Sequence, residues 1–400
     1  MIPAALVVAL LAQAGGDEVV ARVGEVAITA AEVRERAARP RPPKVPQPRP
    51  AELLAALVDD VILAAEGRRT GVAERFVVRV SLETARRQIL GDAFVEQEIA
   101  AAFKPTEAQL RELFHQREDA VKTVVLTYTT PAEAQAALDR LRAGADLTAE
   151  AARSLDPRAA TASTGPTGGL LLRGQLDPAL AAVVFSGPLD TWVGPIKLAL
   201  GHAVARTSAR SLGEEATFLA RRESIARYAR QRYTEEAKAH FVSKQRAKAG
   251  AVVDEAFLKR TERRIEGTPA EMDHVVATVN GKPFRYGELA LAVASFAGGS
   301  GGGHLTGPTL KTQLAWREID ARLLADLAVA KGRDRDPATR ALLERAEREI
   351  LAAATRDQLA SAARSAAERQ ATVQAATQAL RRGATITIDE AALARAVPGT

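Results

Sequence analysis

Apolar and polar positions along this chain follow two patterns, one typical of strands and one typical of helices. Short apolar runs rich in β-branched residues lie at 19–23, 121–128 and 275–279, and they predict strands. Longer stretches place apolar residues three and four positions apart, which predicts amphipathic helices. The main ones are 53–71, 214–248, 314–332 and 338–382. These patterns predict a helix-rich α+β protein.

A sequence pattern near the N-terminus returns far downstream. Ala21 corresponds to Ala277 and Glu32 to Glu288, a constant offset of 256 positions. In each copy two short strands flank a tight turn, and Asn280-Gly281 is a pair that favours a hairpin. A helix follows, capped in the first copy by Thr29 with Glu32 three residues later. We therefore expect two related helical modules.

Both copies also end alike. A short strand and a helix start at 252–258 follow one long charged helix, and the equivalent residues 387–393 follow another. We expect each of these closing strands to return to the hairpin of its own copy. Only the first copy carries an insertion, which spans about residues 120–208.

The insertion contains a series of short motifs in a fixed order. No single motif is diagnostic, whereas their order and spacing together are specific. They are Glu133-Ala134, Gly144-Ala145-Asp146-Leu147, Ser154-Leu155-Asp156-Pro157, Gly168-Gly169, Arg173-Gly174-Gln175-Leu176 with Phe185 nine residues later, Gly194-Pro195-Ile196 and Gly201-His202.

With these motifs the insertion resembles the parvulin-type (PpiC) peptidyl-prolyl cis-trans isomerase, or rotamase, domain. The chain from about 17 to 260 resembles SurA-type and PrsA-type exported foldases. The resemblance implies a helical chaperone module made of 15–118 and 210–262, an inserted parvulin-like domain at 119–209, and a second helical module at 263–400. A coiled-coil or purely structural role for the long helices is the alternative.

The resemblance also implies which residues carry chemistry. Rotation about an Xaa–Pro bond crosses a barrier of roughly 18–20 kcal/mol because the amide has partial double-bond character. Its catalysis needs an apolar seat for the proline ring and polar groups that favour the twisted amide. By position, Leu176 and Leu180 line that seat with support from Phe185, and Asp156 and His202 are the polar catalytic partners. Ordinary core packing is the alternative role of the three apolar residues.

The polar cluster departs from the family pattern. The family places a Cys or Asp beside two histidines, the first of them at or next to Thr123. No histidine occurs between positions 116 and 201, and His202 follows Gly201 directly instead of by two residues. Two functions therefore stay open, a weak isomerase and a non-catalytic holdase chaperone that uses the isomerase fold as a scaffold. A structural protein of the cell envelope is a third.

The N-terminus indicates the compartment. Residues 2–11 form an apolar run too short to span a bilayer, and Ala12-Gln13-Ala14 fits a cleavage signal. We expect a signal peptide at 1–14, cleaved after Ala14, and a periplasmic or secreted protein that does not span the membrane afterwards. A buried N-terminal helix is the alternative, because no Lys or Arg precedes the apolar run.

Composition and charge limit the classes of partner that we expect. The chain has no cysteine, and its formal net charge is +6. The basic residues are interleaved with Glu and Asp along helices, so no nucleic-acid binding is expected. The five histidines are scattered, so no metal and no other cofactor are expected. The expected partners are unfolded or nascent exported polypeptides, outer-membrane proteins among them.

Overall fold

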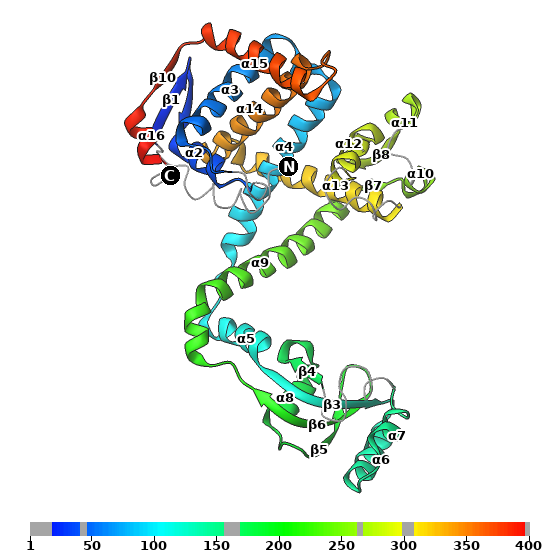
Figure 1. Ribbon diagram of the computed structural model, residues 1–400. Helices are drawn as coiled ribbons and strands as arrows, with labels where there is room; N and C mark the ends of the chain where they lie inside the picture. Colours follow the sequence, from blue (N-terminus) through cyan, green and yellow to red (C-terminus); the bar gives the residue numbers. More distant parts are fainter. Residues whose placement is uncertain (1–17, 41–45, 156–168, 262–266, 298–307, 397–400) are drawn as a thin grey trace. The chain divides into compact units, whose positions relative to one another are not determined.

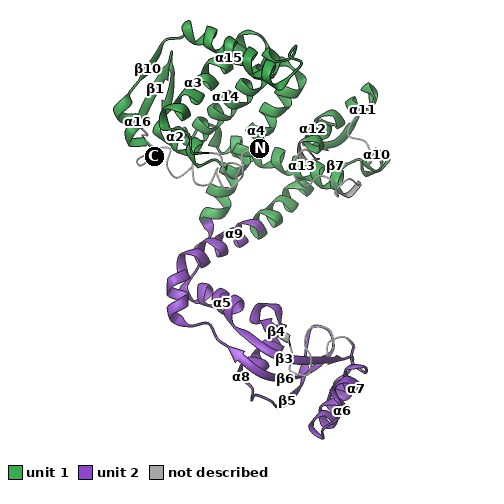
Figure 2. Ribbon diagram, viewed as in Figure 1, with its two compact units in different colours: residues 1–101, 236–400 green, residues 102–235 purple. Residues whose placement is uncertain are grey.

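The computed structural model describes residues 18–40, 46–155, 169–261, 267–297 and 308–396. The chain divides into two compact units (Figure 2). Unit 1 comprises residues 1–101 and 236–400, and unit 2 comprises residues 102–235. The predicted signal peptide lies outside the described residues. No helix in the described ranges is both long and apolar enough to cross a membrane.

The first copy of the repeat opens unit 1. Thr29 accepts a hydrogen bond from the Glu32 N–H, and the Glu32 carboxylate accepts one from the Thr29 N–H, so the predicted capping box begins the first helix. Gly71 has a φ of +72°, a left-handed conformation that glycine adopts without strain. The elements are β1 (Val19–Val23), β2 (Val26–Thr29), α2 (Ala30–Ala38), α3 (Pro50–Arg69), η1 (Val72–Glu74), α4 (Phe76–Phe94), η2 (Val95–Ile99) and η3 (Ala100–Ala102).

The second copy repeats this order. Asn280 and Gly281 have φ values of +50° and +72°, so the predicted hairpin turn is confirmed, and Gly332 repeats the +72° of Gly71. The predicted helix 338–382 is wrong in one respect, because it is two helices, the second capped by Ser365. The elements are α11 (Pro269–Asp273), β8 (Val275–Val279), β9 (Lys282–Arg285), α12 (Tyr286–Ala297), α13 (Pro308–Ala330), η8 (Arg333–Arg335), α14 (Pro337–Leu359), α15 (Ala366–Arg382), β10 (Ile386–Ile388) and α16 (Glu390–Ala396).

The closing strands are exchanged between the copies. β7 (Val252–Val253), expected on the first hairpin, pairs with β8 of the second, and α10 (Glu255–Arg260) follows it. β10, expected on the second hairpin, pairs with β1 of the first. The prediction that each strand closes its own copy is therefore wrong. The residues that follow the two strands make equivalent hydrogen bonds. The Asp254 N–H donates to the Val276 carbonyl and the Asp389 N–H donates to the Val20 carbonyl, each at 2.9 Å.

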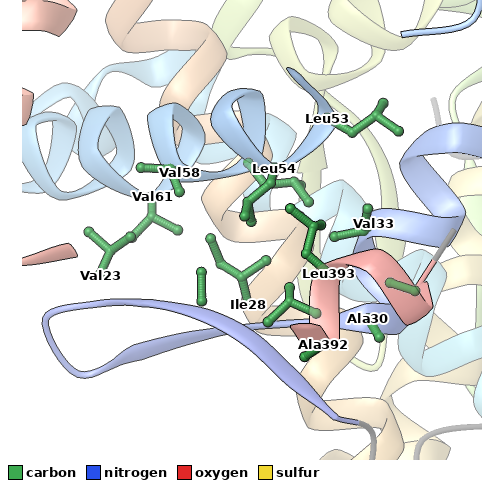
Figure 3. Packing of buried hydrophobic residues seen from close by; sticks show 14 of the residues in the cluster. Val23, Ile28, Ala30, Val33, Leu53, Leu54, Val58, Val61, Ala392 and Leu393 are labelled. Atoms are coloured by element: carbon green, nitrogen blue, oxygen red, sulfur yellow. The ribbon is translucent and has the colours of Figure 1, made fainter. Parts of the chain in front are cut away.

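The helices of unit 1 are exchanged in the same way. α3 packs on α14, and α4 packs on α13 (Figure 1). Equivalent ion pairs join the copies, because Glu32 of α2 pairs with Arg348 of α14 and Glu288 of α12 lies 3.8 Å from Arg87 of α4. Figure 3 shows one of the two resulting cores, in which the first hairpin and α3 meet α16. The two copies therefore fold as one interleaved body.

Unit 2 holds a four-stranded antiparallel sheet in the order β4-β3-β6-β5. Val124, Leu126 and Tyr128 of β3 pack against α6 on one face, and Val121 and Val125 pack against α8 on the other. The elements are α5 (Glu107–Glu118), β3 (Ala120–Tyr128), α6 (Pro131–Arg142), α7 (Leu147–Ala151), β4 (Gly169–Leu172), η6 (Arg173–Gln175), α8 (Pro178–Ser186), β5 (Trp192–Lys197) and β6 (His202–Ser211).

α9 (Glu215–Lys248) contributes residues to both units. Within unit 2 it packs on α5 through Leu110, Phe114, Phe218 and Ile225. Helices thus dominate the described chain and the sheets are small and antiparallel, so the predicted helix-rich α+β class is confirmed.

Candidate functional site

The three residues predicted to seat proline lie together on the α8 face of the unit 2 sheet. Leu180 and Phe185 are buried in an apolar cluster with Val121, Ile196, Ala203 and Ala205 of the strands, and Leu176 packs against that cluster half-buried. We call this group of side chains the α8 cluster. Of the three predicted residues, Leu176 is the one that reaches the surface.

Asp177 fixes the position of α8. Its Oδ1 accepts a hydrogen bond from the Ala179 N–H at 2.9 Å, which caps the helix, and Pro178 occupies the first helical position. Its Oδ2 accepts a second bond from the Ala199 N–H at 3.1 Å in the β5–β6 turn. The Ala199 bond and the helix N–H bonds hold the pKa of the Asp177 carboxyl below its usual value. α8 is therefore tied to the strand edge beside the cluster.

His202 lies on the other face of the same sheet. It is the first residue of β6 and pairs with Tyr128 of β3, which packs on the α6 side. Its neighbour Ala203 belongs to the α8 cluster, and successive strand side chains point to opposite faces. His202 Nδ1 is buried and has no hydrogen-bond partner among the described residues. The structure thus does not bring His202 together with Leu180 and Phe185.

The second predicted polar partner, Asp156, lies outside the described residues. At Thr123, where the resemblance implies a histidine, the structure has a buried hydroxyl. Thr207 Oγ1 lies 3.3 Å from Thr123 Oγ1, and the latter donates to the Arg206 carbonyl at 3.2 Å. This part of the sheet therefore carries hydroxyl groups, which do not change charge near neutral pH. The catalytic roles of Asp156 and His202 stay predictions.

One buried carboxylate beside the α8 cluster was missed by the sequence analysis. Asp119 is 1% exposed, and its Oδ2 accepts from Arg173 Nε at 3.0 Å. The Arg173 guanidinium lies over the Phe185 ring, 4.3 Å from its centroid. The sequence signal for this contact is weak, since Asp119 is an ordinary acidic residue between a helix and a strand.

Unit 1 contains a cleft of about 1200 Å³ between the β1–β2 hairpin, α3, α14 and α15. Its lining combines apolar side chains with charged ones of both signs. The apolar residues include Val61, Ile62, Leu342 and Leu380, and the charged residues include Arg68, Arg69, Arg345, Arg348, Glu32, Glu66 and Glu344. Arg345 and Arg348 pair with Glu35 and Glu32 respectively, and burial raises the pKa of Glu35.

The second copy has a charged side chain at one position that is apolar in this cleft. Gly71 corresponds to Gly332, and by the same offset Val61 corresponds to Arg322. The Arg322 guanidinium lies over the Phe284 ring at 4.5 Å and pairs with Glu288 at 2.5 Å. The second copy therefore holds an arginine at the position where Val61 lines the cleft of the first copy.

Comparisons with known proteins give matches among solved structures. No family model and no curated protein matches the chain. A PpiC-type peptidyl-prolyl cis-trans isomerase domain matches with 19% identity over 24% of this chain and 96% of that chain, at a TM-score of 0.22. A SurA-like chaperone from Campylobacter jejuni matches with 16% identity over 58% of this chain and 98% of that chain, at 0.26.

A PrsA peptidylprolyl isomerase from Bacillus anthracis matches with 14% identity over 46% of this chain and 88% of that chain, at a TM-score of 0.27. Identity and TM-score are low throughout. These matches are PpiC-type isomerase domains and SurA-like or PrsA chaperones, the kinds of protein that the sequence motifs resemble.

Proposed function

We propose that this protein is an exported folding factor of the parvulin type, which binds proline-containing segments of unfolded polypeptides at the α8 cluster. The observation that carries the proposal is the grouping of Leu176, Leu180 and Phe185 around one face of the sheet. It is supported by the ordered motifs of the insertion, from which these three residues were predicted.

The α8 cluster suits a proline ring chemically. A prolyl side chain is apolar and has no N–H to satisfy, so it can enter an apolar seat without losing a hydrogen bond. The planar Xaa–Pro amide owes its double-bond character to a charge-separated resonance form. An apolar seat that excludes water solvates this charge-separated form less well than water does. The planar amide therefore loses more stabilisation than the twisted amide, and the barrier to rotation falls. Such a site gives slow isomerisation without a nucleophile or a metal.

The proposal extends to organisation and location. We propose that residues 119–209 form the isomerase-like domain, and that 15–118, 210–262 and 263–400 form two helical modules with exchanged closing strands. Residues 1–14 act as a signal peptide, and the mature protein works in the periplasm or outside the cell. Its clients are unfolded or nascent exported polypeptides, including outer-membrane proteins.

A second candidate function is that of a holdase without catalysis. Two observations favour it: His202 lies on the α6 side of the sheet, and the unit 1 cleft offers apolar side chains to an unfolded segment. In this alternative the isomerase-like domain serves as a scaffold, and client binding alone prevents aggregation.

The test is isomerisation of a panel of short Xaa-Pro peptides by the purified protein and by Leu176→Ser. We expect a rate above background that falls roughly fivefold in the variant, equivalent to about 1 kcal/mol of lost apolar contact. Leu176 is half-buried, so the variant should fold. Leu189→Ser, at a position that is 46% exposed outside the cluster, is the matched control and should keep the full rate.

A protein that shows no rate above background, yet suppresses aggregation of an unfolded client, would establish the holdase instead. A protein with neither property would contradict both candidates.

A further inference from the structure

Asp119 joins several elements of unit 2 at one buried point. It lies between α5 and β3, and its backbone carbonyl accepts a hydrogen bond from the Arg173 N–H at 2.9 Å. Its Oδ1 accepts from the Gly213 N–H at 2.8 Å, and His115 Nδ1 lies 3.0 Å from the same oxygen. A buried carboxylate is stable only with such partners. The structure supplies them from α5, from the end of β6 and from the 173–175 turn.

Arg173 is held at this point by two of its nitrogens. Nε and Nη2 lie 3.0 and 2.9 Å from Asp119 Oδ2. The next residue, Gly174, is pressed against α5, because a Cβ there would lie 2.9 Å from the Gln116 carbonyl oxygen. The guanidinium therefore has a fixed position, in which it covers the Phe185 ring at 4.3 Å. A planar cation over an aromatic ring is an attractive arrangement.

The backbone of Phe185 is also held, since its carbonyl accepts a hydrogen bond from Arg210 Nη1 at 3.0 Å. With both the ring and the backbone in contact with arginines, Phe185 has one well-defined position in the α8 cluster. A displaced ring would change the packing of the α8 cluster, because interiors are close-packed.

We propose that Asp119 and Arg173 are positioning residues, which hold the Phe185 ring and thereby shape the proline seat of the α8 cluster. The inference rests on the proposed function, since it assumes that the α8 cluster binds proline. Both residues act through Phe185 and not on the reacting amide. A purely structural ion pair between α5 and the 173–175 turn is the alternative that the test must separate.

Arg173→Lys distinguishes the positioning role from a purely structural ion pair. Lysine keeps a positive charge for Asp119, but its ammonium is not planar and cannot make the same stacked contact. Arg173→Met removes both properties. Arg206→Met is the matched control, because Arg206 lies over the Trp192 ring at 5.2 Å on the α6 side of the sheet.

The experiment measures the affinity of the full chain for a fluorescent Xaa-Pro peptide, beside thermal unfolding of each variant. We expect both Arg173 variants to bind roughly threefold to tenfold more weakly than wild type. Arg173→Lys should unfold close to the wild-type temperature, and Arg206→Met should bind within about twofold of wild type. Equal binding by wild type and by folded Arg173→Lys would overturn the inference.

A wild-type protein that binds no Xaa-Pro peptide would count against the proposed function itself. Whether Arg173 positions the Phe185 ring is then decided by the carbon-13 ring resonances of Phe185. A change of these resonances in Arg173→Lys, absent in Arg206→Met, supports it. Unchanged resonances overturn it.

Discussion

The alternation of side chains along β6 decides which of them face the α8 cluster. Ala203 and Ala205 face the α8 cluster, and Val204 faces α6 with His202 on the same side. A shift of one residue in a strand moves a side chain to the other face of the sheet. The direct succession of Gly201 and His202 was visible in the sequence, and in the structure His202 lies on the α6 side while Ala203 lies on the α8 side.

Asp119 shows what the sequence does not reveal at this scale. Its partners Arg173 and Gly213 lie 54 and 94 positions away along the chain. Neither the residue type nor its spacing predicts that meeting, because only the folded sheet brings the ends of β3 and β6 together. The grouping of Leu176, Leu180 and Phe185 was predictable, because they share one helix and its lead-in, within ten residues of each other.

A buried carboxylate on the α6 side gives a prediction about pH. Glu150 is 1% exposed and accepts hydrogen bonds from Arg140 Nε at 2.7 Å and Arg140 Nη2 at 2.8 Å. These bonds hold the pKa of Glu150 below its ordinary value of 4.5. A lowered pKa stabilises the fold above the unfolded-state value, and this contribution is lost as pH falls through the folded-state value.

We therefore expect Glu150→Gln to lower the free energy of unfolding by about 1–3 kcal/mol at pH 7, and by less below about pH 4. Urea unfolding followed by Trp192 fluorescence in a Trp316→Phe background measures this, because Trp192 is buried in the α6-side core. Glu223→Gln, an exposed position of α9, is the control. A difference that does not change with pH would contradict the assignment.

At the scale of elements, local signals were reliable and long-range pairing was not. The capping box at Thr29 and the Asn280-Gly281 turn depend on residues within four positions of each other, and both are present. The closing strands carry equivalent sequences, so either strand fits either hairpin. Sequence alone therefore could not distinguish closure within a copy from exchange between copies. The structure shows exchange, because β7 pairs with β8 and β10 pairs with β1.

The exchange predicts how a cut chain behaves. Cleavage at a protease site introduced at 262–266 gives two fragments. The first fragment ends with β7 and α10, and the second contains β8, β9, β10 and α16. Each fragment then supplies the closing strand of the other. We expect the cut protein to elute from gel filtration as one species and to separate only in denaturant. Two folded fragments that separate under native conditions would mean that each copy closes on itself.

At the scale of the whole molecule, we propose two client-binding regions, one in each unit. One is the α8 cluster of unit 2, and the other is the cleft of unit 1, which Val61 lines at the position equivalent to Arg322. The repeat and the insertion were both visible in the sequence. The cleft was not predictable in detail, since it is lined by α3 of one copy and α14 of the other.

The central claim is that proline-containing segments bind at the α8 cluster. Its most direct test is photo-crosslinking of a short Xaa-Pro peptide to the full chain, with the modified residues identified by mass spectrometry. We predict modifications within 171–185 and 193–203, and their loss in competition with unlabelled peptide but not with an alanine analogue. Modifications confined to the unit 1 cleft, or equal competition by the alanine analogue, would contradict the claim.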